Sequence, residues 1–398
     1  MRVDILKEEL ETELHGILRY WKNYTVDDKY GGFAGQLDWK DQVHPEAPKG
    51  AVLNTRILWT FSAAYQHTHL PEYLEMATRA YDYITSYFID KKYGGLFWSL
   101  NHLGEPLDKK KQVYAQAFGI YALSEYYKCK PIQEVLTQAV SLFEMLLDYA
   151  HDKKYSGFFE AFTLDWKPLP DQRLSEKDEN APKSMNTHLH LLEAFTNLYR
   201  VWPDKKLALH IENLLDDFQN HISNRENNTM HLFFENDWMV IGDVVSFGHD
   251  IEASWLLHEA AEVLDNESWI KKTSQVSINM VEAASKGLDE DGGLWYEASS
   301  DMKRWIYEKH WWPQAEAMVG FFNAYHLSGD EKYLEQSLNC WRFVKKFIKD
   351  NKNGEWFWGV EKNYSIMQKD KAGFWKCPYH NARACMEIIK KISLLTIK

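Results

Sequence analysis

The 398-residue sequence contains few cysteines and no long hydrophobic run. Its four cysteines, Cys129, Cys340, Cys377 and Cys385, include no CxxC pair and fit a reduced compartment. The charged, amphipathic amino terminus has no apolar signal core, and no apolar stretch approaches the length of a bilayer crossing. We therefore expect a cytoplasmic protein without a membrane partner.

Motifs for common cofactors are missing as well. No GxGxxG or GxxxxGK[ST] sequence supports a phosphate cofactor, and no HExxH sequence supports a catalytic zinc. The net charge of −12 provides no basic stripe for nucleic acid. We expect neither a metal nor a nucleic-acid partner.

Aromatic residues, by contrast, are abundant: 17 Trp, 22 Tyr and 20 Phe. Aromatic rings can stack on the C–H faces of sugar rings, and they can equally fill the core of a large helical protein. Composition alone does not choose between these two uses.

Short units of glycine and aromatic residues recur along the chain. They lie at 30–33, 93–98, 155–159, 227–234, 291–296 and 353–358, the fourth being degenerate. The second glycines are 63 residues apart from 32 to 95, 62 from 95 to 157 and 61 from 293 to 354. Such short, glycine-led, alternately aromatic units are typical of small hairpins.

Between these units, apolar residues follow the three-and-four spacing of helices. A first, more apolar set covers 53–67, 114–128, 184–200, 249–264, 314–327 and 380–395. A second set covers 72–88, 132–149, 205–222, 268–285, 331–349 and 4–22. Six helix pairs at one period, with no change of composition between them, indicate a closed ring. The prediction is an all-α, single-domain (α/α)6 barrel over 1–398, with the hairpins at one end.

The longest irregular stretch runs from about 165 to 183 and is rich in Pro, Asp, Glu and Lys. Long loops in compact domains are more often functional than idle. We expect this loop to lie on the rim, over a cavity.

Polar and aromatic residues of unlike character recur near the starts of the first helix set. They are Arg56, Tyr114, Phe118, Asn186, His190, His249, Glu252, Trp312, Glu316 and His380, with Trp375 just before the last. Equivalent positions in a ring face one mouth, and buried charge without a partner is costly. We therefore expect these residues to meet at one cavity.

The stretch from Ser246 to Trp255 is central to this set. His249, Glu252 and Trp255 are spaced by three and should share one side of a helix that Ser246 or Asp250 caps. Glu252 is then expected to orient His249. We expect His188, two positions before His190, to be structural, and Arg383 to be either a ligand-binding residue or an ion-pair partner.

Several histidines with an arginine favour proton transfer next to a carbonyl group. Imidazoles titrate near neutrality, so one can act as base and another as acid. The C2–H of an opened aldose is acidic, and an arginine can stabilise the resulting enediol. Glu252 and Glu316 could instead form a glycosidase pair, but the histidines would then be unexplained. A non-catalytic sugar-binding barrel would have no need of them either.

Five separated segments carry a family resemblance: KGAVLNTRILWTFSAAY, SMNTHLHLLEAFTNLY, FGHDIEASWLL, KHWWPQAEAMVGF and FWKCPYHNAR. Together they resemble the cellobiose 2-epimerases of the N-acylglucosamine 2-epimerase superfamily, over essentially the whole chain. The resemblance implies an (α/α)6 barrel that epimerises the reducing-end glucose of cellobiose or lactose to mannose, without a cofactor. It implies a small-molecule oligosaccharide substrate, and we expect a monomer.

The resemblance also implies roles for single residues. His249 and His380 match the catalytic histidines, and His190 matches a third essential one. The other matched positions bind the substrate: Arg56 and Asn186 at the enediol, Tyr114, Phe118, Trp312 and Trp375 around the sugar rings, and Glu252 and Glu316. Two alternatives within the superfamily remain open: a mannose 2-epimerase or aldose–ketose isomerase acting on free sugars, and a nucleotide-activated N-acylglucosamine epimerase.

Overall fold

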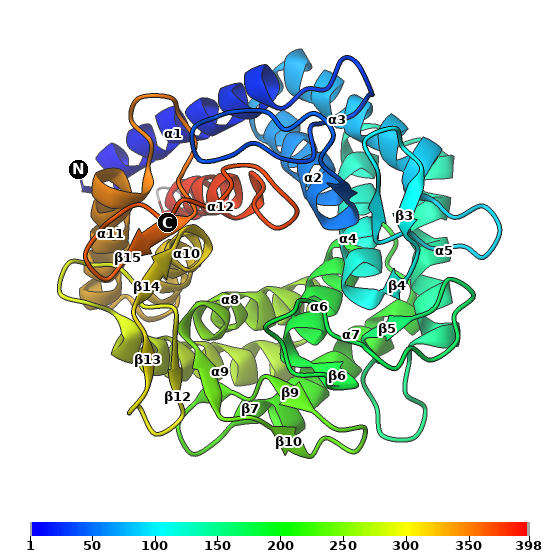
Figure 1. Cartoon of the computed structure of the whole chain (residues 1–398). Helices are drawn as coiled ribbons and strands as arrows, with labels where there is room; N and C mark the ends of the chain where they lie inside the picture. Colours follow the sequence, from blue (N-terminus) through cyan, green and yellow to red (C-terminus); the bar gives the residue numbers. More distant parts are fainter. Residues whose placement is uncertain (1, 396–398) are drawn as a thin grey trace.

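The computed structural model describes residues 2–395, and most of them are helical. An inner ring contains α2 (Ala51–Thr68), α4 (Val113–Cys129), α6 (Met185–Tyr199), α8 (Phe247–Val263), α10 (Trp311–Ser328) and α12 (Tyr379–Leu395). An outer ring contains α1 (Arg2–Tyr24), α3 (Pro71–Tyr83), α5 (Gln133–Tyr149), α7 (Lys205–Asp217), α9 (Glu267–Ala284) and α11 (Glu331–Phe343) (Figure 1). The predicted (α/α)6 barrel is confirmed.

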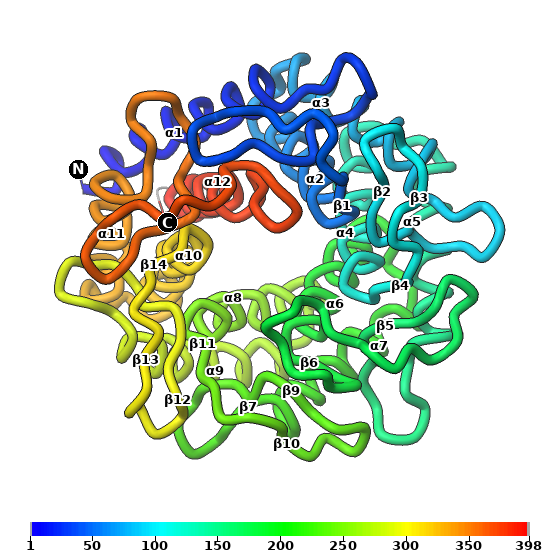
Figure 2. The backbone as a smooth tube through the Cα atoms, viewed as in Figure 1, coloured from blue at the N-terminus to red at the C-terminus, as the bar shows by residue number. Residues whose placement is uncertain are grey.

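The ring closes on itself. Each inner helix contacts the next, and α12 returns to contact α2, as the tube in Figure 2 also shows. The helix α1 packs against α12, so the first and last helices of the chain form one pair. Within residues 2–395, no helix combines the length and apolar character that a bilayer crossing requires.

Burial separates the two rings. The inner helix α4 is buried continuously from Val113 to Tyr126, because it is enclosed on all sides. The outer helix α3 buries only a stripe of Tyr73, Ala77, Ala80 and Tyr83, spaced three or four apart. The more apolar first set of predicted helices is therefore the inner ring.

Three outer helices end in a π-helical turn that the sequence pattern did not indicate. These turns are η1 (Ile84–Phe88), η2 (Phe218–Ile222) and η4 (Val344–Ile348), whereas α9 ends in the 3₁₀ turn η3 (Ser285–Gly287). Each π turn widens the helix by one residue before the chain enters a hairpin. The apolar spacing runs through these turns, so the sequence predicted single uninterrupted helices.

The strands are short and gather at one end of the barrel. They are β1 (Lys49–Gly50), β2 (Ser99–Leu100), β3 (Pro106–Asp108), β4 (Lys111–Gln112), β5 (Ala161–Phe162), β6 (Lys183–Ser184), β7 (Ser223–Asn224), β8 (Thr229–Met230), β9 (Phe233–Phe234), β10 (Val240–Ile241), β11 (Val244–Ser246), β12 (Glu297–Ser299), β13 (Trp305–Ile306), β14 (Glu308–His310) and β15 (Gly359–Glu361). The strand before an inner helix pairs with a strand of the next repeat, as in β1–β2, β4–β5, β6–β9, β11–β12 and β14–β15. A bridge between Leu37 and Ala372 closes this belt.

The predicted hairpins are confirmed as tight turns. In the first copy a single bridge joins Val26 to Phe33, and the intervening Gly31 and Gly32 have φ of 81° and 63°. A side chain is strained in this left-handed region, which explains why glycine recurs in the units.

Five of the six repeats also share a buried ion pair. In four of these repeats the lysine stands two residues before the inner helix, and in the last it stands eight residues before α12. Each lysine reaches the aspartate at the start of its own hairpin, with Nζ–Oδ2 distances of 2.7, 2.8, 2.8, 2.6 and 2.5 Å. The pairs are Lys49–Asp27, Lys111–Asp90, Lys183–Asp152, Lys309–Asp289 and Lys371–Asp350. We call them the hairpin anchors. In the degenerate fourth copy, Asp250 Oδ1 instead accepts a hydrogen bond from the backbone N–H of Met230 at 2.8 Å.

We predict that Lys111→Met destabilises the fold by about 3–5 kcal/mol, because it leaves the buried carboxylate of Asp90 without its cation. Denaturant unfolding followed by circular dichroism measures this free energy. Lys110→Met is the matched control, since that ammonium is more exposed and lies 3.9 Å from Asp108. Equal stability of the two variants would show that the anchors do not hold the hairpins.

Candidate active site

The amino-terminal ends of the inner helices surround a cavity of about 750 Å³, a size common for small-molecule sites. The residues of its inner wall come from equivalent positions of the different inner helices. Second residues of their helices contribute Tyr114, Asn186, Trp312 and His380, and sixth residues contribute Arg56, His190 and Glu252. His249 of α8 and Trp375, before α12, also line it.

Two expected wall residues lie behind the wall instead. Phe118 and Glu316 are also sixth residues, but they are only 1% and 0% exposed. The ring of Phe118 lies 4.9 Å from that of His190 and 4.2 Å from the guanidinium carbon of Arg56. The expectation that these two residues bind substrate directly is therefore corrected: neighbouring side chains cover them, and they support residues that reach the cavity.

Three of the five histidines that line the cavity have Nδ1 beside an oxygen atom of another side chain. Nδ1 of His190 lies 2.8 Å from Glu193 Oε2, and Nδ1 of His380 lies 2.6 Å from Glu316 Oε1. A carboxylate accepts a proton there, so Nδ1 is the donor and Nε2 keeps its lone pair. In His249, Nδ1 lies 2.8 Å from Ser246 Oγ. In each ring Nε2 is the nitrogen left to meet a ligand.

Burial keeps these rings neutral. It lowers the pKa of His249 well below the ordinary 6.5, and the nearby His190 and Lys177 lower it further. The pKa of His380 is also well below 6.5, first through burial and then through Arg56 and Arg383. A neutral imidazole with a free Nε2 is ready to accept a proton.

The expectation that Glu252 orients His249 is wrong. The partner of His249 is Ser246, whose hydroxyl makes this contact instead of capping the helix. Glu252 Oε1 accepts from Arg383 Nη2 at 2.6 Å and lies 4.0 Å from Nδ1 of His380. His249 and Glu252 share a helix face, but His249 pairs with the residue that precedes its own helix, whereas Glu252 pairs with Arg383 of the neighbouring α12.

Arg383 resolves the choice left open above, because it is an ion-pair partner. It is 1% exposed, and its Nη2 donates to Glu252 Oε1 and Glu316 Oε1, each at 2.6 Å. Its Nη1 donates to Glu193 and to the hydroxyl of Tyr379, which in turn donates to Glu193. One guanidinium thus joins carboxylates from α6, α8 and α10.

The three carboxylates do not share their charge equally. Burial alone would raise the pKa of Glu193, but Arg383 and the hydrogen bonds from His190 and Tyr379 lower it to about 2. Burial, and then the neighbouring Glu316, raise the pKa of Glu252 well above 4.5. Burial also raises the pKa of Glu316, but to a smaller extent against the opposing effect of Arg383. Because Glu316 Oε1 accepts from both Arg383 and His380, we assign the negative charge to Glu316 and a retained proton to Glu252.

Among the polar atoms of cavity-wall residues that have no partner within the described chain, two belong to residues that the sequence analysis singled out, Arg56 and Asn186. Nη2 of Arg56 donates to the hydroxyl of Tyr114 at 2.8 Å, but the buried Nε has no acceptor. The side-chain oxygen of Asn186 is likewise buried without a donor. Buried polar atoms are rarely left unpaired, so these two atoms suit a ligand that brings hydroxyl groups.

Aromatic rings border the cavity. Trp312 contacts two of the histidines, with ring centroids 4.7 Å from His249 and 5.7 Å from His380. Trp375 lies 6.2 Å from Tyr114. In contrast, Trp255 is buried and donates to Glu316 Oε2 at 3.1 Å, so it positions that carboxylate.

The wall residues that the sequence reasoning missed include three from the hairpin units: Glu160, Tyr296 and Trp358. Each follows the buried residue of its hairpin unit by two positions, after Phe158, Leu294 and Trp356. Residues two apart in a strand point to the same side, so the hairpin register could have revealed them.

His188 has the structural role expected of it. Its Nε2 accepts from the backbone N–H of Phe158 at 2.9 Å, and its Nδ1 lies 2.6 Å from the carbonyl oxygen of Ser184. Gln116 and Gln314, at the same position of their helices, hold Leu96 and Leu294 in the same way. His188 therefore joins a helix to its hairpin.

One group of side chains has the spacing of metal ligands. Ligand atoms of Glu252, Glu316 and His380 lie within 4.8 Å of one another. Nη2 of Arg383 already lies 2.6 Å from both carboxylates. This guanidinium supplies the positive charge that the carboxylates require, and it would repel a metal cation.

Known proteins resemble this chain over its length. A family model described as N-acylglucosamine 2-epimerase matches residues 31–384. A cellobiose 2-epimerase of Bacteroides fragilis is 47% identical over 388 residues, covering 97% of this chain and 99% of the relative. A D-mannose isomerase of Marinomonas mediterranea is 24% identical over 406 residues, covering 98% of each chain.

A solved structure agrees with these sequence matches. The cellobiose 2-epimerase of Bacillus thermoamylovorans superposes with a TM-score of 0.92 at 40% identity. The match covers 97% of this chain and 99% of that one.

Proposed function

Because this chain belongs to the N-acylglucosamine 2-epimerase family, we propose that it inverts C2 of the reducing-end glucose in cellobiose and other β-1,4-linked disaccharides, such as lactose. The product carries mannose at that end. One observation carries the proposal: three histidine rings around one cavity have Nδ1 held by the protein and Nε2 free for a ligand.

The reaction moves one proton off C2 and returns another to the opposite face. After the sugar ring opens, Nε2 of one histidine removes the C2 proton, and the C–H electrons form the C1=C2 bond of a cis-enediol. The C1 carbonyl electrons move to O1 in this step. A second histidine, protonated at Nε2 from solvent, then delivers that proton to the other face of C2, while the electron pair on O1 re-forms the carbonyl and the first histidine releases its proton to solvent. His249 and His380 take these two roles, and the ring of Trp312 contacts both of them.

Arg56, Asn186 and His190 act on the oxygen atoms. The unpaired Nε of Arg56 donates to the enediol oxygens, where negative charge develops, and Asn186 bonds a neighbouring hydroxyl group. His190 bonds the reacting oxygens while Glu193 fixes its ring. No step requires a metal or an organic cofactor.

Trp312, Trp375 and Tyr114 hold the sugar rings, since aromatic faces suit the C–H faces of pyranoses. Glu252 reaches the same cavity and, as a neutral acid, donates a hydrogen bond to a sugar oxygen. The same histidines could also act on free mannose, so the substrate panel must include monosaccharides.

The whole chain acts as one catalytic domain and as a monomer in the reducing cytoplasm. The cavity wall takes residues from inner helices of one chain, so no partner subunit is needed to complete it. All four cysteines are free thiols.

We predict that cellobiose incubated in deuterated water, with chelator present, yields 4-O-glucosyl-mannose carrying deuterium at C2. The deuterium comes from solvent, because the histidine that delivers it to C2 has taken its own deuteron from the solvent. Product chromatography with mass spectrometry and proton NMR measures this, alongside lactose, glucose, mannose and N-acetylglucosamine. Turnover without C2 deuterium would exclude the enediol route, and turnover of monosaccharides alone would exclude the disaccharide assignment.

A further inference from the structure

The segment from 171 to 181 crosses the mouth of the cavity. It belongs to the long connection between β5 and β6, as the sequence led us to expect of a rim loop. Gln172, Ser175, Lys177 and Glu179 are among its residues that line the cavity. At its base, Nε2 of Gln112 donates to the carbonyl oxygen of Gln172 at 3.3 Å.

Internal hydrogen bonds give this segment a defined shape. The backbone N–H and hydroxyl of Ser175 donate to Asp178 Oδ2 at 2.9 and 2.7 Å. Asn180 joins the two arms, because its Oδ1 accepts from the N–H of Gln172 at 2.9 Å and its Nδ2 donates to the carbonyl oxygen of Pro170 at 3.0 Å. The segment can therefore move as a unit.

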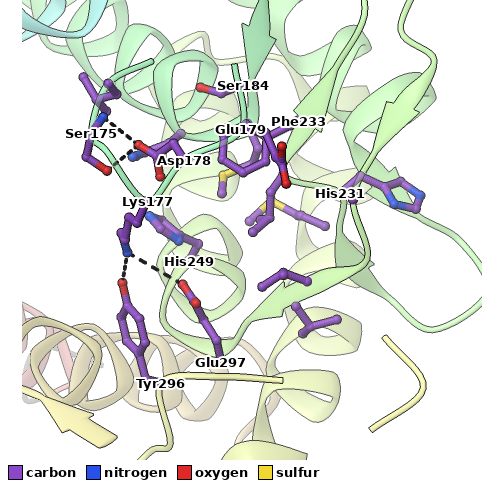
Figure 3. A pocket seen from close by; sticks show the side chains of 18 of the residues that line it. Ser175, Lys177, Asp178, Glu179, Ser184, His231, Phe233, His249, Tyr296 and Glu297 are labelled. Atoms are coloured by element: carbon purple, nitrogen blue, oxygen red, sulfur yellow. Dashed lines mark hydrogen bonds and ion pairs between the residues drawn. The ribbon is translucent and has the colours of Figure 1, made fainter. Parts of the chain in front are cut away.

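Lys177 extends from the tip of this unit to the opposite wall (Figure 3). Its Nζ donates to the hydroxyl of Tyr296, which is 119 residues further along the chain. The same Nζ lies 3.9 Å from Glu297 Oε1. The Lys177 side chain is 61% exposed. An ion pair this exposed is weak and easily broken. The contact of Lys177 with Tyr296 and Glu297 is therefore suited to forming and breaking reversibly.

Tyr296, which accepts the hydrogen bond from Lys177, is held in place by neighbouring side chains. The ring of Tyr296 stacks on that of His310 at 4.0 Å, and Nε2 of His310 lies 2.7 Å from Glu308 Oε2. Tyr296 also meets Trp312 edge-on at 6.3 Å. Lys177 lies beside His249 in Figure 3, and its positive charge adds to burial and His190 in lowering the pKa of that histidine.

We propose that Lys177 is a positioning residue whose ammonium, bound by Tyr296 and Glu297, latches the 171–181 segment across the cavity mouth and so retains a disaccharide. The latch opens to admit the sugar and closes over its second ring, while the first ring lies among the histidines. Free monosaccharides do not extend to the latch. This rests on the proposed function for its substrate, but not for the latch itself.

Kinetics of Lys177→Met, Tyr296→Phe and the double variant test the latch. Each single change is expected to raise KM for cellobiose about fivefold, which corresponds to loss of a partly exposed contact. The expected change in kcat is much smaller. The double variant should be no worse than either single one, because both remove the same contact. Multiplying effects, or an unchanged KM in Lys177→Met, would overturn the proposal.

Amide hydrogen exchange without sugar tests the latch independently of turnover. Exchange in 171–181 should speed up in Lys177→Met and Tyr296→Phe. Lys167→Met is the matched control, since that ammonium pairs with Asp165 at 2.7 Å on the same connection and should leave exchange and KM unchanged. If Lys177 only touches the sugar, the exchange stays as in the wild type, and the latch is refuted. An enzyme inactive on cellobiose would refute the proposed function while this measurement still decided the latch.

Discussion

Replacing His380 with alanine is expected to lower kcat for cellobiose by at least about a thousandfold, and His249→Ala should do the same. General acid–base groups contribute 10²–10⁴-fold, and each histidine here serves one face of C2 in both directions. Both rings line the cavity and contact Trp312, and the proposed mechanism assigns them to opposite faces of C2, so neither can replace the other. Steady-state kinetics with product chromatography measures the loss.

Two controls separate chemistry from folding. His380→Asn keeps a donor near Glu316 and should be as inactive as His380→Ala, although it folds normally by circular dichroism and thermal unfolding. His44→Ala changes a histidine whose side chain is 49% exposed and should keep full activity. A near-normal rate in either alanine variant of the cavity would refute the assigned roles.

Arg383→Met is expected to cost about 3–5 kcal/mol of folding free energy and to eliminate activity as well. Methionine preserves much of the volume, but Glu193, Glu252 and Glu316 then face one another without the guanidinium. Glu193 and Glu316 also orient His190 and His380, so the loss extends to the catalytic rings. Denaturant unfolding and cellobiose kinetics measure the two effects.

The loss of folding stability in Arg383→Met is expected to depend on pH in a defined direction. The pKa of Glu193 is lowered from 4.5 to about 2 in the folded protein, with Arg383 the largest favourable influence against burial. The stabilisation is fully present above 4.5 and is lost as pH falls towards 2. The stability gap between wild type and Arg383→Met should therefore be largest at neutral pH and narrow below 4.5.

Further variants test the same network. Arg383→Met/Glu193→Gln should recover part of the stability, because it removes one of the charges that the arginine had balanced. Arg342→Met is the surface control, with a side chain 57% exposed, and should change stability little. A gap that does not depend on pH would show that Arg383 acts through packing and not through charge.

The sequence predicted the barrel because the residues that recur in each repeat are those that the backbone conformation requires. Positive φ at Gly31 and Gly32 recurs as glycine at each well-formed unit, and helix periodicity lies between the units. The hairpin anchors recur as well, as Lys49 with Asp27 and Lys111 with Asp90, but a lysine beside a helix start reads as a surface residue. Burial of that lysine depends on the belt of strands above it, which the sequence pattern alone does not reveal.

For the site, the repeat predicted which residues reach the cavity but not which side chains they bond to. Sixth residues such as Arg56 and His190 meet at one cavity because the inner helices are equivalent. The pairing of Glu252 with Arg383 joins different helices, and spacing within one helix cannot reveal it. The Ser246–His249 contact was missed because the serine was taken as a helix cap.

The pairing of α1 with α12 has a consequence for biosynthesis. A ribosome makes Glu193, Glu252 and Glu316 well before Arg383, so a nascent chain carries these acids before the arginine that they share has been translated. The helix that brings the cation also needs α1, the earliest helix made, to cover its outer side. A truncated product would therefore hold an open arc of repeats with mutually repelling acids at its centre, and cellular proteases could distinguish it from the finished enzyme.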